Sequence, residues 1–279
     1  MRIIETAGIT EAVRRLCIEA NRNLPSDVRE CIRRAAAEEP WEPAKDTLEK
    51  IVANFELAAS RGVPVCQDTG MACVFLAMGR DVRIEGDLYA AIDEGVRRGY
   101  AEGFLRCSVV ADPLERVNTG DNTPAMVYVE FVDGDRLGIT VAPKGFGSEN
   151  MSRIRMLRPS DGREGVIEFV VSAVEEAGPN PCPPLVVGVG IGGTFDKAAF
   201  LAKKALLRPL DRDADAPYYR DLEAEILWRI NGLGIGPQGF GGRTTALKVA
   251  VEAMPTHIAG LPCAVNINCH VARHASEVL

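Results

Sequence analysis

The sequence is poor in aromatic residues and histidine, and it contains no long apolar run. Phe, Trp and Tyr make up 6% of the 279 residues, and the net charge is -7. Few aromatic residues argue against a base-stacking surface, and an acidic chain lacks the clustered basic face that phosphate contacts need. No stretch approaches the roughly 20 apolar residues of a membrane-spanning helix, and the first residues lack the basic and apolar regions of a signal peptide. We therefore expect a cytoplasmic globular protein without nucleic-acid or membrane partners.

The cysteines do not form the pattern of a disulfide scaffold. Eight of them are spread over the whole chain, at positions 17, 31, 66, 73, 107, 182, 263 and 269. Such spacing in a cytoplasmic chain is not typical of a small secreted domain. Cys17 and Cys31 fall within helical patterns, where a free cysteine behaves as a small hydrophobic residue, so we expect both in the core.

The order of hydrophobic patterns favours an α+β fold with mixed or antiparallel sheets flanked by helices. Apolar residues recur at helical spacing three times in the first sixty residues, which predicts a helical N-terminal region. Residues 71–79 and 185–193 read as strands, 125–145 as a hairpin around Asp133 and Gly134, and 255–270 as a final strand pair. Neither a repeat nor a domain boundary is visible in the sequence. We therefore expect one large domain, 1–279.

Three glycine-bearing loops are candidates for ligand binding. Gly188, Gly190 and Gly193 have GxGxxG spacing after a strand and before a helix, which is either a dinucleotide fingerprint or a tight turn in which Thr194 caps the helix. The acidic residue expected later in the fingerprint is missing. The loop 234–245 contains five glycines and Arg243, a possible carboxylate contact, and the loop 144–155 is polar. Either loop could instead be a simple connection.

The histidines lie close to the last two cysteines. His257, His270 and His274 accompany Cys263 and Cys269, and the C-x5-CH-x3-H spacing hints at zinc. A second close ligand pair such as CxxC is missing, so a structural zinc site is only weakly indicated.

Four segments together carry a resemblance to a known family. They are VPVCQDTG at 63–70, NPCPPLVVGVGIGGTFDKAA at 180–199, GIGPQGFGG at 234–242 and LPCAVNINCHVARH at 261–274. In this order, they resemble the α subunit, or N-terminal domain, of the class I fumarase and L-tartrate dehydratase family, and the similarity covers nearly the whole chain. Members of that family are iron-sulfur hydro-lyases whose [4Fe-4S] cluster is held by three cysteine thiolates, leaving one iron open for substrate.

The resemblance implies a set of cluster ligands. The matching cysteines are Cys66 in CQDTG, Cys182 in NPCPP and Cys269 in NINCH. Cys263 competes with Cys269 for the third position. Cys269 is favoured because its NxxC segment matches the end of the family's domain, twelve residues after the matching active-site histidine, His257.

The resemblance also implies substrate contacts. Gln67 would donate to a substrate carboxylate, and Asp68 would handle a proton near the hydroxyl group. Arg106 would bind a carboxylate bidentately, and His257 would act as a hydrogen-bonding or acid-base residue. The segment KGFGSEN, in which Phe146 replaces the usual glycine, would present the backbone N–H of Gly147.

The expected activity is the reversible hydration of fumarate to L-malate, with L-tartrate dehydration as the alternative on the same scaffold. The family's catalytic base and further arginines lie in a β-type domain that we expect on a separate chain. The expected enzyme is an α2β2 heterotetramer that acts on a small dicarboxylate and is inactive without its β subunit. From other classes, a non-catalytic nucleotide-binding module and a structural zinc protein remain as alternatives.

Overall fold

The computed structural model describes all 279 residues and forms two compact units. Unit 1 consists of Met1–Pro25, Phe55–Phe146 and Arg273–Leu279, whereas unit 2 consists of Ser26–Asn54 and Gly147–Ala272. Two of the boundaries fall inside α3 (Glu42–Arg61) and α5 (Phe146–Glu149). Because the units are assembled from separated segments and change over within helices, no linker composition marks them in the sequence.

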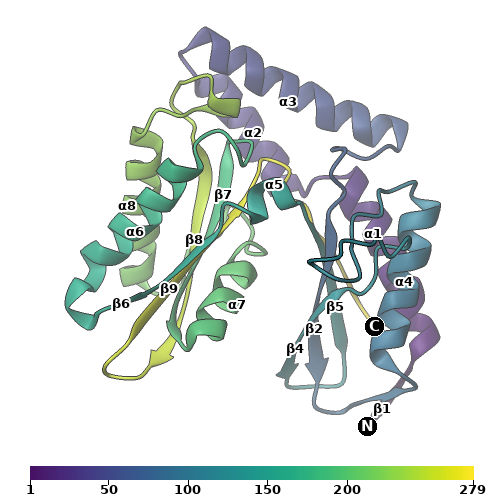
Figure 1. The fold of residues 1–279 in the computed structure, drawn as a ribbon. Helices are drawn as coiled ribbons and strands as arrows, with labels where there is room; N and C mark the ends of the chain where they lie inside the picture. The colour runs from purple at the N-terminus through teal and green to yellow at the C-terminus, as the bar shows by residue number, and fades with distance from the viewer. The chain divides into compact units, whose positions relative to one another are not determined.

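Unit 1 is built on a four-stranded mixed sheet with the order β10-β5-β2-β4 (Figure 1). Helices α1 and α4 pack against each other, α1 also contacts β5 and β10, and β1 pairs in parallel with β3. The elements are β1 (Arg2–Glu5), α1 (Thr6–Arg22), β2 (Met71–Gly79), β3 (Val82–Glu85), α4 (Leu88–Glu102), β4 (Met126–Val132), β5 (Leu137–Lys144) and β10 (Ala275–Val278).

Glycines allow the two helices of unit 1 to approach closely. A Cβ on Gly99 would lie 2.8 Å from the Cβ of Cys17 and 2.9 Å from the carbonyl oxygen of Arg14. Cys17 is fully buried in this contact, and Cys31 in α2 is also buried, as we expected for both. The sequence GVRRG in α4 therefore serves helix packing.

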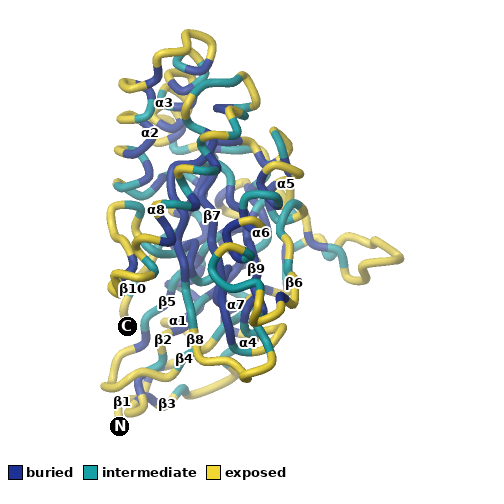
Figure 2. Tube along the Cα trace, turned by 90° about the vertical axis from the view of Figure 1, so that its left-hand side faces the viewer, coloured by how far each residue is buried: buried dark blue, intermediate teal, exposed yellow.

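Unit 2 contains a second four-stranded mixed sheet, with the order β6-β9-β7-β8. Helices α6 and α8 cover one face, and α7 lies on the other (Figure 1). The elements are α2 (Ser26–Glu38), most of α3, β6 (Arg153–Leu157), the 3-10 helix η1 (Pro159–Asp161), α6 (Gly162–Ala177), β7 (Leu185–Gly193), α7 (Phe195–Ala205), α8 (Pro217–Gly232), the 3-10 helix η2 (Pro237–Gly239), β8 (Ala246–Thr256) and β9 (Leu261–Asn268). Strand β7 is almost entirely buried (Figure 2).

The α+β fold class and the helical N-terminal region are confirmed, but two predicted strand pairings are wrong. Strands β4 and β5 do not form a hairpin, because β2 lies between them, parallel to β4 and antiparallel to β5. Likewise β8 and β9 do not pair, because β7 lies between them. In each unit, the two consecutive strands are joined by a short connection. It passes over the end of the strand that lies between them, which comes earlier in the chain.

Three strands of each sheet share one topology, although the sequence shows no repeat. In each sheet, the chain leaves a central strand (β2 or β7), forms one or more helices, and returns as a neighbouring parallel strand (β4 or β8). The chain then turns and adds an antiparallel strand (β5 or β9) on the other side of the central strand. Cys66 lies shortly before β2, and Cys182 lies shortly before β7. The two cysteines therefore stand at corresponding positions.

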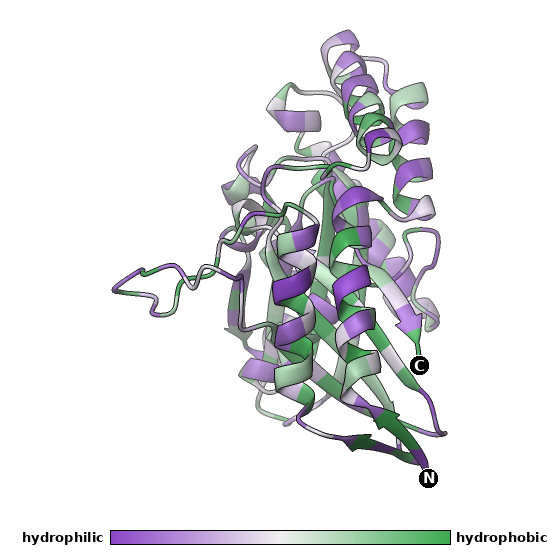
Figure 3. Ribbon diagram, turned by 90° about the vertical axis from the view of Figure 1, so that its right-hand side faces the viewer, coloured by the Kyte–Doolittle hydropathy of each residue, from purple (hydrophilic) through white to green (hydrophobic).

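The distribution of apolar and polar residues agrees with this arrangement of sheets and helices. The strands carry long apolar stretches, whereas the helices alternate between polar and apolar residues (Figure 3). No helix combines the length and apolar character needed to cross a bilayer.

Candidate active site

The loop Cys66–Gly70 is held by its carbonyl groups. The hydroxyl of Tyr100 donates to the carbonyls of Thr69 (2.9 Å) and Gly70 (3.0 Å), and the amide of Asn122 also donates to Gly70 (3.2 Å). Arg273 donates to the carbonyl of Asp68. Tyr100, Asn122 and Arg273 are buried, whereas Gln67 is exposed and Cys66 is partly exposed. Buried donors thus fix the loop backbone beneath a set of accessible polar side chains.

The carboxylate of Asp68 is oriented by backbone N–H groups. One oxygen accepts from Gly70 (3.0 Å), and the other accepts from Phe146 (2.9 Å), the first residue of α5. A Cβ on Gly145 would lie only 2.9 Å from this second oxygen, so glycine is needed for the approach. These contacts hold the side chain of Asp68 in one orientation.

Arg106 is attached to the same loop through Thr69. The buried hydroxyl of Thr69 accepts from the backbone N–H of Arg106 at 2.9 Å. The guanidinium of Arg106 is exposed and forms no hydrogen bond or ion pair. Unit 1 therefore places Arg106 beside the loop that carries Cys66, Gln67 and Asp68.

Cys182 and Cys269 are neighbours in unit 2. Cys182 is exposed and has a left-handed backbone (φ 57°), and Cys269 directly follows β9. The backbone N–H of His270 donates to the carbonyl of Cys182 (3.4 Å), and Nδ1 of the His270 ring lies 3.0 Å from the same oxygen. Gln238, from the loop GIGPQGFGG, donates to the carbonyl of Pro183 (2.6 Å) and lies 3.2 Å from Nδ1 of His270. The second glycine-rich loop thus supports the two cysteine segments.

Cys263 differs from Cys269 in its surroundings. It is fully buried within β9, among the apolar residues beneath α6 and α8, and burial raises the pKa of its thiol to about 12. A thiol of this kind is inert as a metal ligand, because the thiolate is the form that binds. No group of three or more His, Cys, Asp and Glu side chains is placed to hold a metal ion. Cys263 is in the core and His257 lies at the opposite end of β9 from Cys269, so these residues do not combine into the zinc site considered above.

The glycines of β7 are explained by helix packing. A Cβ on Gly188 would lie 2.1 Å from the carbonyl oxygen of Ala202, and one on Gly190 would lie 2.0 Å from that of Ala198, both in α7. The helix therefore rests directly on the strand backbone. Thr194 precedes α7 but its hydroxyl bonds to Asp196 (2.6 Å) and does not cap the helix. These contacts account for the GxGxxG spacing without a nucleotide.

A polar network joins the loop after β5 to β9. Glu149 accepts from Lys203 (2.6 Å) and from Asn266 (2.7 Å), and Asn266 also donates to the hydroxyl of Ser152 (2.8 Å). Gly147 lies in the same short helix as Glu149 and is exposed. The network therefore fixes the loop carrying Gly147 to the strand that leads into Cys269.

His257 lies apart from the cysteines of its own unit. It is exposed in the turn between β8 and β9, next to the end of β7, whereas Cys182 and Cys269 lie at the start of β7 and the end of β9. The eight residues of β9 span roughly 25 Å. The structure therefore does not bring His257 together with Cys182 and Cys269 within one chain.

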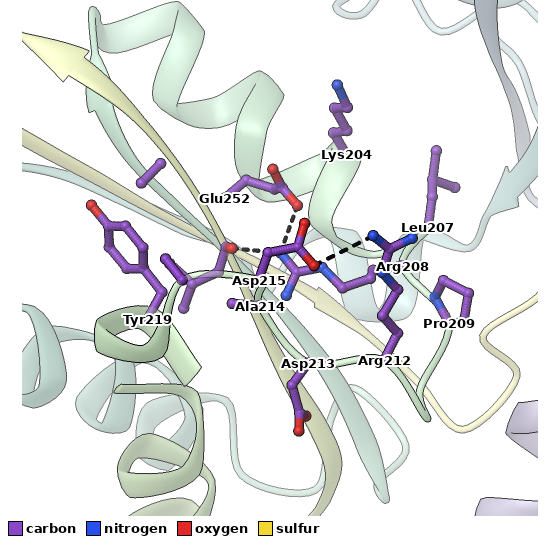
Figure 4. A pocket seen from close by; sticks show the side chains of 13 residues that line it. Lys204, Leu207, Arg208, Pro209, Arg212, Asp213, Ala214, Asp215, Tyr219 and Glu252 are labelled. Atoms are coloured by element: carbon purple, nitrogen blue, oxygen red, sulfur yellow. Dashed lines mark hydrogen bonds and ion pairs between the residues drawn. The ribbon is translucent and has the colours of Figure 1, made fainter. Parts of the chain in front are cut away.

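A surface pocket in unit 2 lies beside β8 and contains none of these residues (Figure 4). Arg208 donates to Glu252 and to the carbonyl of Val251, each at 2.6 Å, and Arg212 pairs with Asp215 at 3.4 Å. Its charges face one another, so the pocket presents no field of a single sign to a ligand.

The sequence analysis missed the residues that hold the site from below. Tyr100 and Asn122 gave no signal of their own, because their function depends on contacts between distant segments, and Gln238 was marked only by its place in GIGPQGFGG. Arg273 lies inside the motif LPCAVNINCHVARH, and this position was its only signal.

Comparison with known proteins identifies the family. The family model described as fumarate hydratase (fumerase) matches residues 10–278. The chain therefore belongs to the fumarate hydratase family of hydro-lyases.

The most informative relatives are α subunits. A chain of Methanocaldococcus jannaschii named "Putative L(+)-tartrate dehydratase subunit alpha" is 43% identical over 275 residues, which cover 96% of each chain. The L(+)-tartrate dehydratase α subunit of Escherichia coli strain UTI89 is 31% identical over 272 residues, covering 96% of this chain and 89% of the relative. That of Shigella sonnei is 30% identical over the same length.

Proposed function

We propose that this chain is the α subunit of an iron-sulfur hydro-lyase that hydrates fumarate reversibly to L-malate. The observation that carries the proposal is the loop Cys66–Gly70, whose carbonyls are bound by buried donors while a thiol, an amide and a carboxylate remain accessible. A ligand, a substrate contact and an acid-base group in succession are what such a reaction requires.

The donor set fits a [4Fe-4S] cluster. Cys66, Cys182 and Cys269 lie on loops, outside the hydrophobic core and outside any disulfide, and two of them are held by the contact between Cys182 and His270. Three thiolates would leave one iron without a protein ligand. When bound, such a cluster supplies a Lewis acid for the hydroxyl group that enters or leaves.

The remaining residues would bind and orient the dicarboxylate. The exposed Arg106 would hold one carboxylate through two parallel N–H bonds, and Gln67 and the N–H of Gly147 would donate further hydrogen bonds. Asp68, fixed by two backbone N–H groups, would accept or return a proton at the hydroxyl group. His257 would act as a hydrogen-bonding residue from the turn after β8.

L-Tartrate is the second candidate substrate, because the relatives reported above are named as tartrate dehydratase subunits. Fumarate hydration and tartrate dehydration differ by one hydroxyl group on the substrate. The assay that separates them compares kcat/KM for fumarate, L-malate and L-tartrate in the same anaerobic preparation with the β subunit. A preference for L-tartrate would replace the first candidate by the second.

The assembly is also part of the proposal. The relatives' names as α subunits support a partner β subunit, which would bring the catalytic base and further arginines on its β-type domain. In this arrangement the present chain, 1–279, is the cluster-binding part of an α2β2 heterotetramer. The cytoplasmic location stays a prediction.

The ligand assignment is tested by anaerobic reconstitution followed by iron and sulfide analysis. Cys66→Ser, Cys182→Ser and Cys269→Ser should each lower the cluster content, whereas Cys263→Ser should retain it because Cys263 is a core residue. Unchanged cluster content in all three ligand variants would show that the assignment is wrong.

A further inference from the structure

Arg273 is a buried cation without a full set of partners. Only 4% of the residue is exposed, and Nη2 of its guanidinium donates to the carbonyl of Asp68. Its Nε and Nη1 atoms have no hydrogen-bond partner. A buried charge without compensation is costly, and arginines in such positions normally face a carboxylate or another anion.

The groups of unit 1 around Arg273 do not compensate its charge. The carboxylate of Asp68 is engaged by the N–H groups of Gly70 and Phe146, and only its carbonyl faces Arg273. Burial raises the pKa of Tyr100, and the positive charge of Arg273 acts on this phenol in the opposite direction. The field of Arg273 thus reaches a neutral hydroxyl that is itself bonded to the Cys66–Gly70 loop.

The position of Arg273 links it to the predicted ligands. It lies four residues after Cys269 in the chain, and its contact with Asp68 is two residues after Cys66. The planar guanidinium donates through fixed directions, so one bond to a carbonyl leaves its other N–H groups oriented for a second acceptor.

We propose that Arg273 is an anion-binding residue of this site, with Nε and Nη1 donating to an anion beside the Cys66–Asp68 loop. The inference deepens the proposed function and rests on it for the source of the anion. The source is either the sulfur of the bound cluster or a carboxylate of the substrate. Both are acceptors that a buried guanidinium would bind strongly.

The test uses the full chain, reconstituted anaerobically, as Arg273→Gln and Arg273→Lys variants. Arg14→Gln is the matched control, because it removes a guanidinium of unit 1 that pairs with Glu11 and Glu102 and lies outside the loop. The measurements are iron and sulfide per chain, the reduction potential of the cluster, and the Kd for succinate, an unreactive dicarboxylate.

Two results support the inference and distinguish the source. If cluster sulfur is the acceptor, Arg273→Gln has a lower iron content or a more negative potential than Arg14→Gln, because a cationic donor near the sulfur favours the reduced cluster. If the substrate carboxylate is the acceptor, content and potential stay the same and the Kd for succinate rises about tenfold or more. In either case Arg273→Lys is intermediate, because lysine keeps the charge but not the fork.

Other results overturn it. A folded Arg273→Gln chain that matches Arg14→Gln in cluster content, potential and succinate affinity shows a purely structural residue. If neither Arg273 variant folds, the thermal midpoint of the wild-type chain is the deciding measurement. Binding of either the cluster or succinate must raise this midpoint. A wild-type chain that takes up no iron refutes the proposed function, and succinate binding to the metal-free chain then decides the inference alone.

Discussion

At the scale of single residues, Asp68 combines a fixed orientation with access to the surface. Both carboxylate oxygens accept backbone N–H groups, and the side chain is only partly buried. The carboxylate is therefore held in one orientation while it stays accessible. Its neighbours Cys66 and Gln67 share the same backbone, so the three proposed functions can be tested one at a time.

We predict that Asp68→Asn separates cluster binding from catalysis. The amide has nearly the shape of the carboxylate but cannot take up a proton, so kcat of the complete enzyme should fall by about 10² to 10⁴-fold. Iron and sulfide content should stay at the wild-type value. If the variant kept activity within a few fold of wild type, Asp68 would not be the residue that transfers the proton.

Thiol reactivity should identify the ligands directly. Burial raises the pKa of Cys17 and of Cys263 to about 12, so at pH 8 only about one thiol in 10⁴ is ionised, and neither should react with iodoacetamide. Cys66, Cys107, Cys182 and Cys269 are accessible and should be labelled in the metal-free chain.

Cluster assembly then provides the control. Cys66, Cys182 and Cys269 should become protected while Cys107 remains labelled, as measured by peptide mass spectrometry. If Cys107 became protected and one of these three did not, Cys107 would take the place of that cysteine in the ligand set.

The residue scale also shows how far the sequence leads. The motif CQDTG made Cys66, Gln67 and Asp68 candidates, and the backbone of Arg106 is bonded to the same loop. It could not single out Arg273, because an arginine between Ala272 and His274 looks like any other surface cation. That it is buried under a loop more than two hundred residues earlier is visible only in the fold.

At the scale of elements, the sequence predicted most helices and strands but not their neighbours. The strand patterns over 71–79 and 185–193 agree with β2 and β7. The predicted hairpin around Gly134 was wrong, because two strands that are consecutive in the chain need not pair with each other. Here β2, which comes earlier in the chain, lies between them. Spacing across an inserted strand is about 10 Å, which a four-residue connection spans easily.

The contact between β7 and α7 gives a prediction at this scale. In Gly190→Ala, the new Cβ would lie 2.0 Å from the carbonyl oxygen of Ala198 and 2.5 Å from the backbone nitrogen of Ala202. Because both are backbone atoms, α7 must shift, and the free energy of unfolding from urea titration should fall by about 2 kcal/mol or more.

Gly232→Ala is the matched control in the same unit. No atom lies within 4 Å of a Cβ at Gly232, and its φ is ordinary for a helix, so stability should change by less than about 1 kcal/mol. Equal losses in both variants would mean that close packing is not the reason for glycine at 190. A nucleotide fingerprint would instead predict a loss of nucleotide binding without this loss of stability.

At the scale of the whole molecule, the proposed ligands are divided between the two units. Cys66 belongs to unit 1, and Cys182 and Cys269 belong to unit 2. The two units have separate sheets. We predict that loading the cluster raises the thermal midpoint of the chain, and that Cys66→Ser and Cys182→Ser each abolish this increase. A midpoint that rises equally in both variants would contradict a shared cluster.

The chain without its β subunit should carry the cluster and show no hydratase activity. The expected catalytic base and further arginines would come from the partner, so addition of purified β subunit should restore turnover of fumarate or L-tartrate. Activity of the cluster-loaded chain by itself would contradict the division of the site between subunits.

The position of His257 leads to a prediction about the assembly. His257 lies roughly 25 Å along the sheet from Cys269 in its own chain, so a role in catalysis requires that it reaches the site of a second α subunit. His257→Ala and Cys269→Ser should each be inactive as uniform tetramers. Co-assembled, they should regain about a quarter of wild-type activity, because half of the randomly paired assemblies are mixed and each mixed pair contains one complete site. If His257 acted within its own chain, or not at all, the mixture would show no gain over the separate variants, and measuring turnover before and after co-assembly distinguishes these cases.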